Sequence, residues 1–148
     1  MKVAFIVASL GQVGPVVVVR NLVEKMMAYG YECVVFYFDE RENTMEFACE
    51  TRKISFWRRE DFRDFDWVHA HSFRPMVYVS RLKGVRKMVT MHSYLFKEYH
   101  DSLGRLVGNL LGHYTMAIVR RFDSVVVLSE DAKTYYSKWS AVKTIKIK

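Results

Sequence analysis

The sequence has 148 residues, 51% of them apolar, and a formal net charge of +7. That length fits a single domain with its own core, and no run approaches the roughly 18–20 uninterrupted apolar residues of a membrane-spanning helix. The charge suits a nucleic acid, an anionic membrane surface or a phosphorylated substrate, but zinc-finger, RNP-type and helix-turn-helix signatures are missing, so we expect no nucleic-acid partner.

The lack of a recognisable signal peptide and the small number of cysteines both favour a cytoplasmic protein. The short apolar run near the start is not followed by the small-residue cleavage site of a signal peptide, and Arg20 and the charges beyond it are typical of a folded domain. Cys33 lies inside an apolar run, and Cys49 is the only other cysteine. We expect both to be reduced thiols and not a disulfide.

The first predicted element is a strand over Lys2–Ala8, whose continuous apolarity is typical of a parallel sheet covered on both faces. Gly11, Gly14 and Pro15 follow it. Proline suits the first turn of a helix, so the valine run Val16–Val19 is predicted to begin a helix despite its strand propensity. The chain would therefore begin with a strand, a Gly-containing loop and a helix.

The rest of the chain alternates strands with helices. Further strands are predicted at Tyr31–Phe38, Lys53–Phe56 (an edge strand), Asp66–His71, Arg86–His92, Asp123–Leu128 and Lys143–Lys148. Further helices are predicted at Pro75–Leu82, at Asp101–Arg121 and from the N-cap Ser129 to about Trp139. This alternation predicts an α/β fold with a doubly wound, Rossmann-like, mostly parallel sheet and helices on both faces.

The predicted helix Asp101–Arg121 carries a broad apolar stripe at helical spacing. The stripe consists of Leu103, Leu106, Val107, Leu110, Leu111, Tyr114 and Ile118. We expect most of it to pack on the sheet, with Arg105, Arg120 and Arg121 in solvent. The surplus positive charge would attract anionic headgroups, so we expect weak peripheral binding to anionic membranes that fades as salt rises.

Ligands of open α/β sheets bind outside the carboxyl ends of the strands. This rule selects Ser9–Gly14, Asp39–Arg41, His71-Ser72, His92-Ser93 and Ser129-Glu130. The Gly loop has neither Rossmann nor Walker A spacing; either a ligand approaches its backbone or it is a tight turn. His92 ends a strand, so it is either a base at the mouth of the cleft or a cap of the following loop.

Two pairs of residues are spaced like metal ligands. His69 and His71 share one face of a strand as an HxH pair, but no carboxylate cluster completes a ligand set. Asp64 and Asp66 form an Asp-x-Asp pattern, yet they precede their strand and would lie at the wrong end of the sheet. We therefore expect no metal, with His69 packed, His71 near the cleft and both aspartates in solvent.

Four stretches in chain order resemble the N-terminal domain of retaining GT-B glycosyltransferases of family 4. They are the opening "MKVAFIVASLGQVGPVVVVRNLVEKMMAYGYECVVFYF", the fourth-strand motif "DWVHAHS", the fifth-strand motif "VTMHSYLF" and the sixth strand with its helix, "FDSVVVLSEDAKTYYSKW". The resemblance covers nearly the whole chain and implies that residues 1–148 form one half of a GT-B fold, a Rossmann-like N-terminal domain. The C-terminal nucleotide-sugar-binding domain of that pattern is absent from the sequence.

The resemblance implies the acceptor-binding half of an enzyme that moves a sugar from a nucleotide-sugar to a glycan or lipid-linked acceptor, in polysaccharide or glycolipid synthesis. His92 falls at the catalytic position of the fifth strand. The residues expected to bind substrate are Gly11, Gly14, His71, Ser72, Ser93, Ser129 and Glu130. GT-B enzymes are typically metal-independent, so no cofactor is expected and the nucleotide-sugar is a co-substrate. Without the C-terminal domain, this hexosyltransferase-type chain is expected to be inactive.

Two departures from the family pattern leave other functions open. The Gly loop of the family is more often followed by a glutamate, but here Val17 or Val18 takes that position, and the nucleotide-binding half is missing. The alternatives are a non-catalytic Rossmann-like binding module and a nucleotide-binding enzyme of another doubly wound family. Because relatives often act on lipid-linked acceptors, the leading hypothesis implies a cytoplasmic protein with a peripheral place on the inner face of the membrane.

Overall fold

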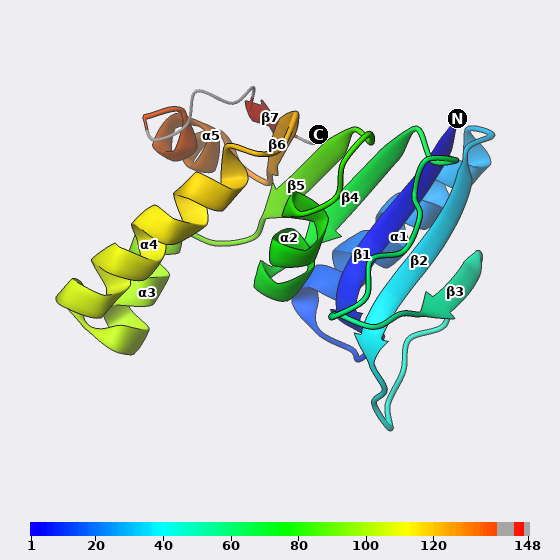
Figure 1. Ribbon diagram of the computed structural model, residues 1–148, viewed down its shortest axis with the longest axis horizontal. Helices are drawn as coiled ribbons and strands as arrows, with labels where there is room; N and C mark the ends of the chain where they lie inside the picture. Colours follow the sequence, from blue (N-terminus) through cyan, green and yellow to red (C-terminus); the bar gives the residue numbers. More distant parts are fainter. Residues whose placement is uncertain (139–143, 147–148) are drawn as a thin grey trace. The chain divides into compact units, whose positions relative to one another are not determined.

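The structure, a computed structural model, describes residues 1–138 and 144–146 (Figure 1). The chain divides into two compact units, Met1–Lys87 and Met88–Lys148. The first holds β1 (Lys2–Ser9), α1 (Gly14–Ala28), β2 (Glu32–Asp39), β3 (Glu50–Lys53), β4 (Trp67–His71) and α2 (Phe73–Ser80). After β5 (Lys87–Met91), which starts at the boundary, the second holds α3 (Leu95–Leu103), α4 (Arg105–Val119), β6 (Ser124–Val127), α5 (Glu130–Ser137) and β7 (Thr144–Lys146).

The strands of the first unit form a parallel sheet in the order β3-β2-β1-β4. Val3 of β1 pairs with Cys33 of β2 on one side and with Trp67 of β4 on the other. Phe5 and Ile6, in the middle of β1, have no exposed surface. Burial at consecutive positions confirms that this strand is covered on both faces, as its continuous apolar pattern predicts.

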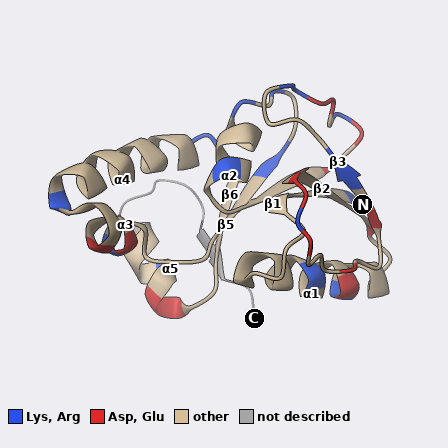
Figure 2. Cartoon of the chain, turned by 90° about the horizontal axis from the view of Figure 1, so that it is seen from below, with Lys and Arg blue, Asp and Glu red and all other residues tan. Residues whose placement is uncertain are grey.

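Helices α1 and α2 cover opposite faces of this sheet (Figures 1 and 2). Helix α1 buries Val16, Val19 and Val23 against β1 and β2, and its proline lies in the first turn. The valine run is therefore helical, as predicted. Burial on the sheet outweighs the lower helix propensity of valine, and the proline ring is already set at a helical φ angle.

The strands of the second unit are parallel as well. Val125 of β6 pairs with Val89 of β5 and with Thr144 of β7. The Ser129 hydroxyl accepts a hydrogen bond of 3.1 Å from the Ala132 N–H, so it caps α5 as predicted. The predicted end of this helix near residue 139 and the outer parts of the last strand, residues 143 and 147–148, lie outside the described residues.

The predicted edge strand Lys53–Phe56 is wrong in its bounds, because β3 spans Glu50–Lys53. The Ile54 N–H still donates to the Tyr37 carbonyl at 2.8 Å, but the chain then turns away. The Phe56 ring packs edge-on against the Phe38 ring, with ring centres 5.5 Å apart. Beyond Ile54, the contact between the Phe56 and Phe38 rings therefore takes the place of backbone hydrogen bonds to β2.

The predicted single helix Asp101–Arg121 is wrong. Gly104, with φ 76° and ψ 167°, separates α3 from α4, because this backbone conformation cannot continue a right-handed helix. The expectation that its apolar stripe packs on the sheet is also wrong: Leu106 is 86% exposed and Leu110 is 74% exposed. The glycines of α4 face inward instead.

Candidate functional site

The loop after β1 lies at the carboxyl edge of the first unit and contains both glycines of the predicted site. Gly11 is buried, because Thr44 forms a backbone bridge with it and the Met45 N–H donates to the Leu10 carbonyl at 2.8 Å. Gly14 opens α1 and is exposed, and a Cβ there would meet nothing within 4 Å. Solvent therefore reaches Gly14, whereas Gly11 shapes a covered turn.

Ser72 links β4 to α2 with backbone angles of φ 77° and ψ 173°. Almost only glycine populates this region, and another residue held there is strained by about 1–3 kcal/mol. Within residues 1–138 and 144–146, Ser72 alone combines a side chain with a positive φ. Strain at the carboxyl end of a strand favours a functional role for this predicted substrate-binding residue.

Ser72→Gly is expected to raise the free energy of unfolding by about 1 kcal/mol, because glycine adopts these angles without steric cost. Urea unfolding followed by circular dichroism measures the change. Ser102→Gly, in α3, is the control and should instead lower stability by about 0.5 kcal/mol, as glycine does in helices. Equal losses in both variants would show that Ser72 stores no strain.

Strand β4 places His69 and His71 side by side, with ring centres 4.2 Å apart. The Phe5 ring centre lies 5.5 Å from that of His69 and 6.0 Å from that of His71. His69 is packed, as predicted. His71 has no exposed surface, so it is buried and does not open to solvent as a residue of a cleft would, and its role in substrate binding stays a prediction.

The aspartate pair lies at the opposite end of the first unit's sheet. Asp66 precedes β4, and its carboxylate accepts the Lys2 backbone N–H at 2.7 Å, where β1 begins. Asp64 is exposed. This placement confirms the interpretation of the pair as a solvated strand entry, away from the carboxyl edge.

A hollow of about 550 Å³ opens at the carboxyl edge, beyond the ends of β2 and β3. On its polar side Arg74 Nη1 lies 2.5 Å from Asp39 Oδ2. The Arg74 guanidinium lies 5.5 Å from the centre of the Phe38 ring and 5.4 Å from that of Phe56. Trp57, which is 84% exposed, also lines the hollow. Its size and mixture of aromatic and polar side chains fit a small polar ligand with a ring.

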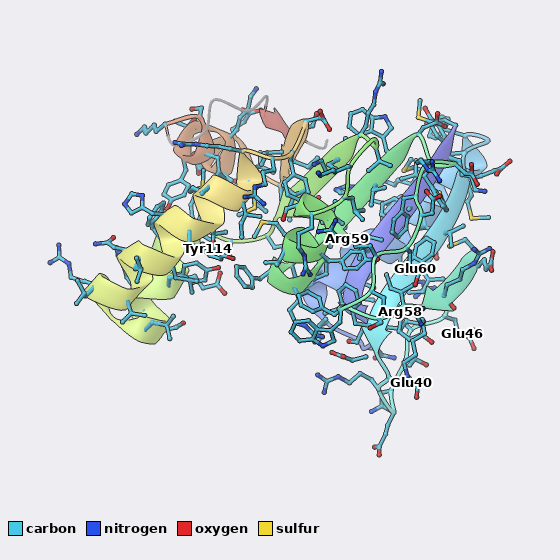
Figure 3. All side chains as sticks on the ribbon, in the orientation of Figure 1. Glu40, Glu46, Arg58, Arg59, Glu60 and Tyr114 are labelled. Carbon is cyan, nitrogen blue, oxygen red and sulfur yellow. The ribbon has the colours of Figure 1, made fainter. Side chains whose placement is uncertain are left out.

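Only part of this hollow is visible in the sequence. The rule of strand ends selects Asp39–Arg41 but not the aromatic pair Phe56-Trp57 or Arg74. Figure 3 labels Arg58 on the segment that follows this pair. The available signal is a tryptophan beside a run of charged residues directly after a strand, where a large aromatic side chain has little core to fill.

His92 directly follows β5 in the second unit, and its side chain is half-buried. Burial lowers the pKa of its imidazole below the usual value of about 6.5. The ring is therefore neutral near pH 7, which is the form that accepts a proton. The predicted strand ended at His92, and β5 ends one residue earlier, at Met91. The catalytic role of His92 stays a prediction.

Two tyrosines of α5 hold the loop that follows His92. The Tyr136 hydroxyl donates to the Ser93 carbonyl at 2.5 Å and accepts the Leu95 N–H at 3.1 Å. The Tyr135 hydroxyl accepts another backbone N–H of α3 at 3.2 Å. Tyr136 is fully buried, which raises its pKa well above the usual range. Helix α5 therefore positions the residues next to His92.

The other predicted site residues of the second unit lie around the same loop and the start of α5. The Ser93 hydroxyl donates to the Glu98 carboxylate, and both residues line a hollow of about 330 Å³. Ser129 uses its hydroxyl as the helix cap. Glu130 is exposed in the first turn of α5, with its carboxylate 3.9 Å from Lys133 Nζ.

In the part of the chain that the structure describes, no group of three or more His, Cys, Asp and Glu side chains lies close enough to hold a metal ion. No helix in these residues is both long and apolar enough to cross a membrane. Cys33 and Cys49 are free thiols, and burial raises the pKa of Cys33 to about 11.

The sequence is similar to known glycosyltransferases. The profile of Glycosyltransferase Family 4 matches residues 14–148. The O-antigen biosynthesis glycosyltransferase WclY of Escherichia coli is 28% identical over 145 residues, covering 92% of this chain and 41% of WclY. The chain thus spans less than half the length of the curated relatives that it matches.

Two solved structures are similar in fold. Sucrose-phosphate synthase from Thermosynechococcus elongatus has a TM-score of 0.72 at 18% identity, covering 99% of this chain and 47% of that protein. An alpha-glucosyltransferase in complex with UDP and a DNA 13-mer has a TM-score of 0.61 at 16% identity. The match covers 97% of this chain and 41% of that protein. These likenesses confirm the mostly parallel, Rossmann-like α/β fold.

Proposed function

Because the chain belongs to glycosyltransferase family 4, we propose that it is the acceptor-binding half of a retaining glycosyltransferase. It would hold a glycan or lipid-linked acceptor onto which a sugar is moved from a nucleotide-sugar. The family match over residues 14–148 is the observation that carries this proposal. The name of the relative WclY, from O-antigen biosynthesis, supports a place in polysaccharide or glycolipid synthesis.

The hollow at the carboxyl edge of the first unit supports a sugar acceptor. Trp57 offers an exposed aromatic surface on which a sugar ring can stack. Asp39 and Arg74 present planar polar groups that can exchange hydrogen bonds with neighbouring hydroxyls. We assign the acceptor to this place, with Ser72 and Gly14 as further substrate contacts on the same edge.

In the second unit, His92 would act on a sugar hydroxyl. A neutral imidazole after β5 can take a proton from a hydroxyl, or it can position that hydroxyl while the leaving diphosphate assists. Ser93, Ser129 and Glu130 would line the cleft beside it. The proposal includes no metal or other cofactor, and the nucleotide-sugar is a co-substrate held by a second, nucleotide-binding domain.

We also propose a cytoplasmic place at the anionic inner face of a membrane. A net charge of +7 attracts anionic headgroups over about one Debye length, roughly 8 Å at physiological salt. The attraction would bring the chain close to lipid-linked acceptors.

The 148-residue chain alone is expected to show no sugar transfer. Transfer needs donor and acceptor held in contact with water excluded, which supplies roughly 7–11 kcal/mol of the barrier. The experiment incubates the chain with nucleotide-sugars and acceptor glycans or lipid-linked sugars, with and without a separately supplied nucleotide-sugar-binding domain of the family. Transfer only in the combined sample supports the proposal.

Donor hydrolysis or transfer by the chain alone, lost in His92→Ala, would reveal a self-sufficient site. If the combined sample binds donor and acceptor but transfers nothing, the chain is a binding module and not half of an enzyme.

A further inference from the structure

Helix α4 turns its largest apolar side chains toward solvent. Leu106 is 86% exposed and Leu110 is 74% exposed, and Val107 and Tyr114 are each more than half exposed. Leu106, Leu110 and Tyr114 follow one another at about one helical turn, so they form a continuous row. Figure 3 labels Tyr114 on this helix. We call Leu106, Val107, Leu110 and Tyr114 the α4 apolar face; a patch of this kind marks an interaction site.

The packing of α4 against α3 keeps this face outside. Gly108 and Gly112 are buried on the opposite side of α4. A Cβ at Gly108 would lie 2.8 Å from the backbone carbonyl of Tyr99, and a Cβ at Gly112 would overlap the Phe96 ring. Only glycines allow α3 to approach so closely. Rotating α4 to bury its leucines would drive side chains into α3, so the exposure is built into the packing.

The charged residues of α4 and of its two ends are all basic, whereas the neighbouring helix α3 carries acidic Glu98 and Asp101 as well as Lys97. Arg105 begins α4, Arg120 and Arg121 follow it, and no Asp or Glu occurs from Arg105 to Phe122. Figure 2 shows α4 without acidic residues between these basic ends. A symmetric contact with a second copy would bring these arginines against their equivalents, which like-charge repulsion disfavours. An anionic lipid surface complements them.

We propose that α4 lies in the interface of an anionic bilayer, with Leu106 and Leu110 among the acyl chains and the arginines at the phosphates. Amphipathic helices bind in this way, parallel to the membrane plane. The Tyr114 ring has the apolar body and polar tip that suit the headgroup level. The proposal rests on the peripheral membrane location proposed above. It adds that the leucines of α4 insert into the bilayer, so the chain is not held by electrostatic attraction alone. It does not depend on sugar transfer.

The test is co-sedimentation of the chain with vesicles of phosphatidylcholine, with or without phosphatidylglycerol, at low and high salt. The unmodified chain is expected to bind the anionic vesicles, and a part of this binding should persist at high salt. Leu106→Gln/Leu110→Gln is expected to weaken binding roughly tenfold at low salt and to abolish the salt-resistant part, because glutamine keeps the charge and the helix but removes apolar area.

Val17→Gln/Tyr29→Gln is the matched control, since both side chains are exposed on or beside α1, at 40% and 83%. It should bind like the unmodified chain. Circular dichroism establishes that each variant is folded. Arg120→Gln/Arg121→Gln should reduce binding at low salt and leave the salt-resistant part.

Several outcomes would overturn the proposal. They are binding by Leu106→Gln/Leu110→Gln equal to that of the control, equal binding to neutral and anionic vesicles, and no binding at low salt. A stable dimer in light scattering that Leu106→Gln/Leu110→Gln converts to monomer would show that a second copy covers the face instead of lipid.

Discussion

Replacing His92 by alanine is expected to slow sugar transfer by roughly 10²–10⁴-fold in the enzyme completed with its nucleotide-sugar-binding domain. The imidazole follows β5 directly, and the half-buried ring is held neutral near pH 7 by the burial that lowers its pKa. A neutral base at the carboxyl end of β5 can accept or orient the proton of a sugar hydroxyl. Single-turnover rates at saturating donor and acceptor measure the loss.

The pH dependence of transfer gives a second readout of His92. Because its pKa lies below the usual value of about 6.5, the rate should stay level as pH falls to that value and decline only below it. The same shift affects stability. The unfolded chain binds the proton first, so the folded state loses stability as pH falls through about 6.5 toward the lower folded pKa. His92→Ala should remove both effects.

His69→Ala separates a catalytic loss from a structural one. His69 is buried, with its ring centre 5.5 Å from that of Phe5, so its removal should mainly lower the free energy of unfolding. His92→Ala should fold normally, because its side chain is only half-buried. Unchanged turnover in a well-folded His92→Ala enzyme would remove this residue from the site.

Gly112→Ala is expected to lower the free energy of unfolding by about 2–3 kcal/mol. A Cβ at Gly112 would overlap the ring of Phe96, which is 7% exposed. The His113 ring centre lies 5.4 Å from that of Phe96, so the ring has little room to withdraw. The gain in helix propensity from glycine to alanine, about 1 kcal/mol, offsets only part of the strain.

Gly14→Ala is the control for this substitution. Gly14 also lies in a helix, but a Cβ there meets nothing within 4 Å, so alanine should leave stability unchanged or raise it by up to about 1 kcal/mol. Urea unfolding followed by circular dichroism measures both variants. If Gly112→Ala is as stable as Gly14→Ala, α3 and α4 do not pack as closely as the structure indicates.

Local patterns in the sequence were sufficient for the buried central strands of the sheet and for α1. A strand buried on both faces needs an apolar residue at nearly every position. In Lys2–Ala8 every residue after Lys2 is apolar. The start of α1 is visible because, among the positions of a helix, Pro15 fits those of the first turn. Ser129 is also recognisable from the sequence as a cap, because its hydrogen-bond partner Ala132 is only three residues away.

The hollow beside Trp57 depends on contacts that no local pattern contains. Asp39 and Arg74 are 35 positions apart, and they meet because β4 lies two strands from β2 in the sheet of the first unit. The unusual backbone of Ser72 is likewise set by the junction of β4 and α2 and not by serine itself, which normally avoids these angles.

The sequence by itself determined a Rossmann-like α/β fold and a set of residues at the carboxyl ends of its strands, because both follow from short-range spacing. Which face of α4 is buried was decided by the tertiary structure alone. The leucine spacing is the same whichever way the helix turns. Steric fit selects the side: α3 approaches so closely that only Gly108 and Gly112 can lie between the two helices, and the leucines are left in solvent.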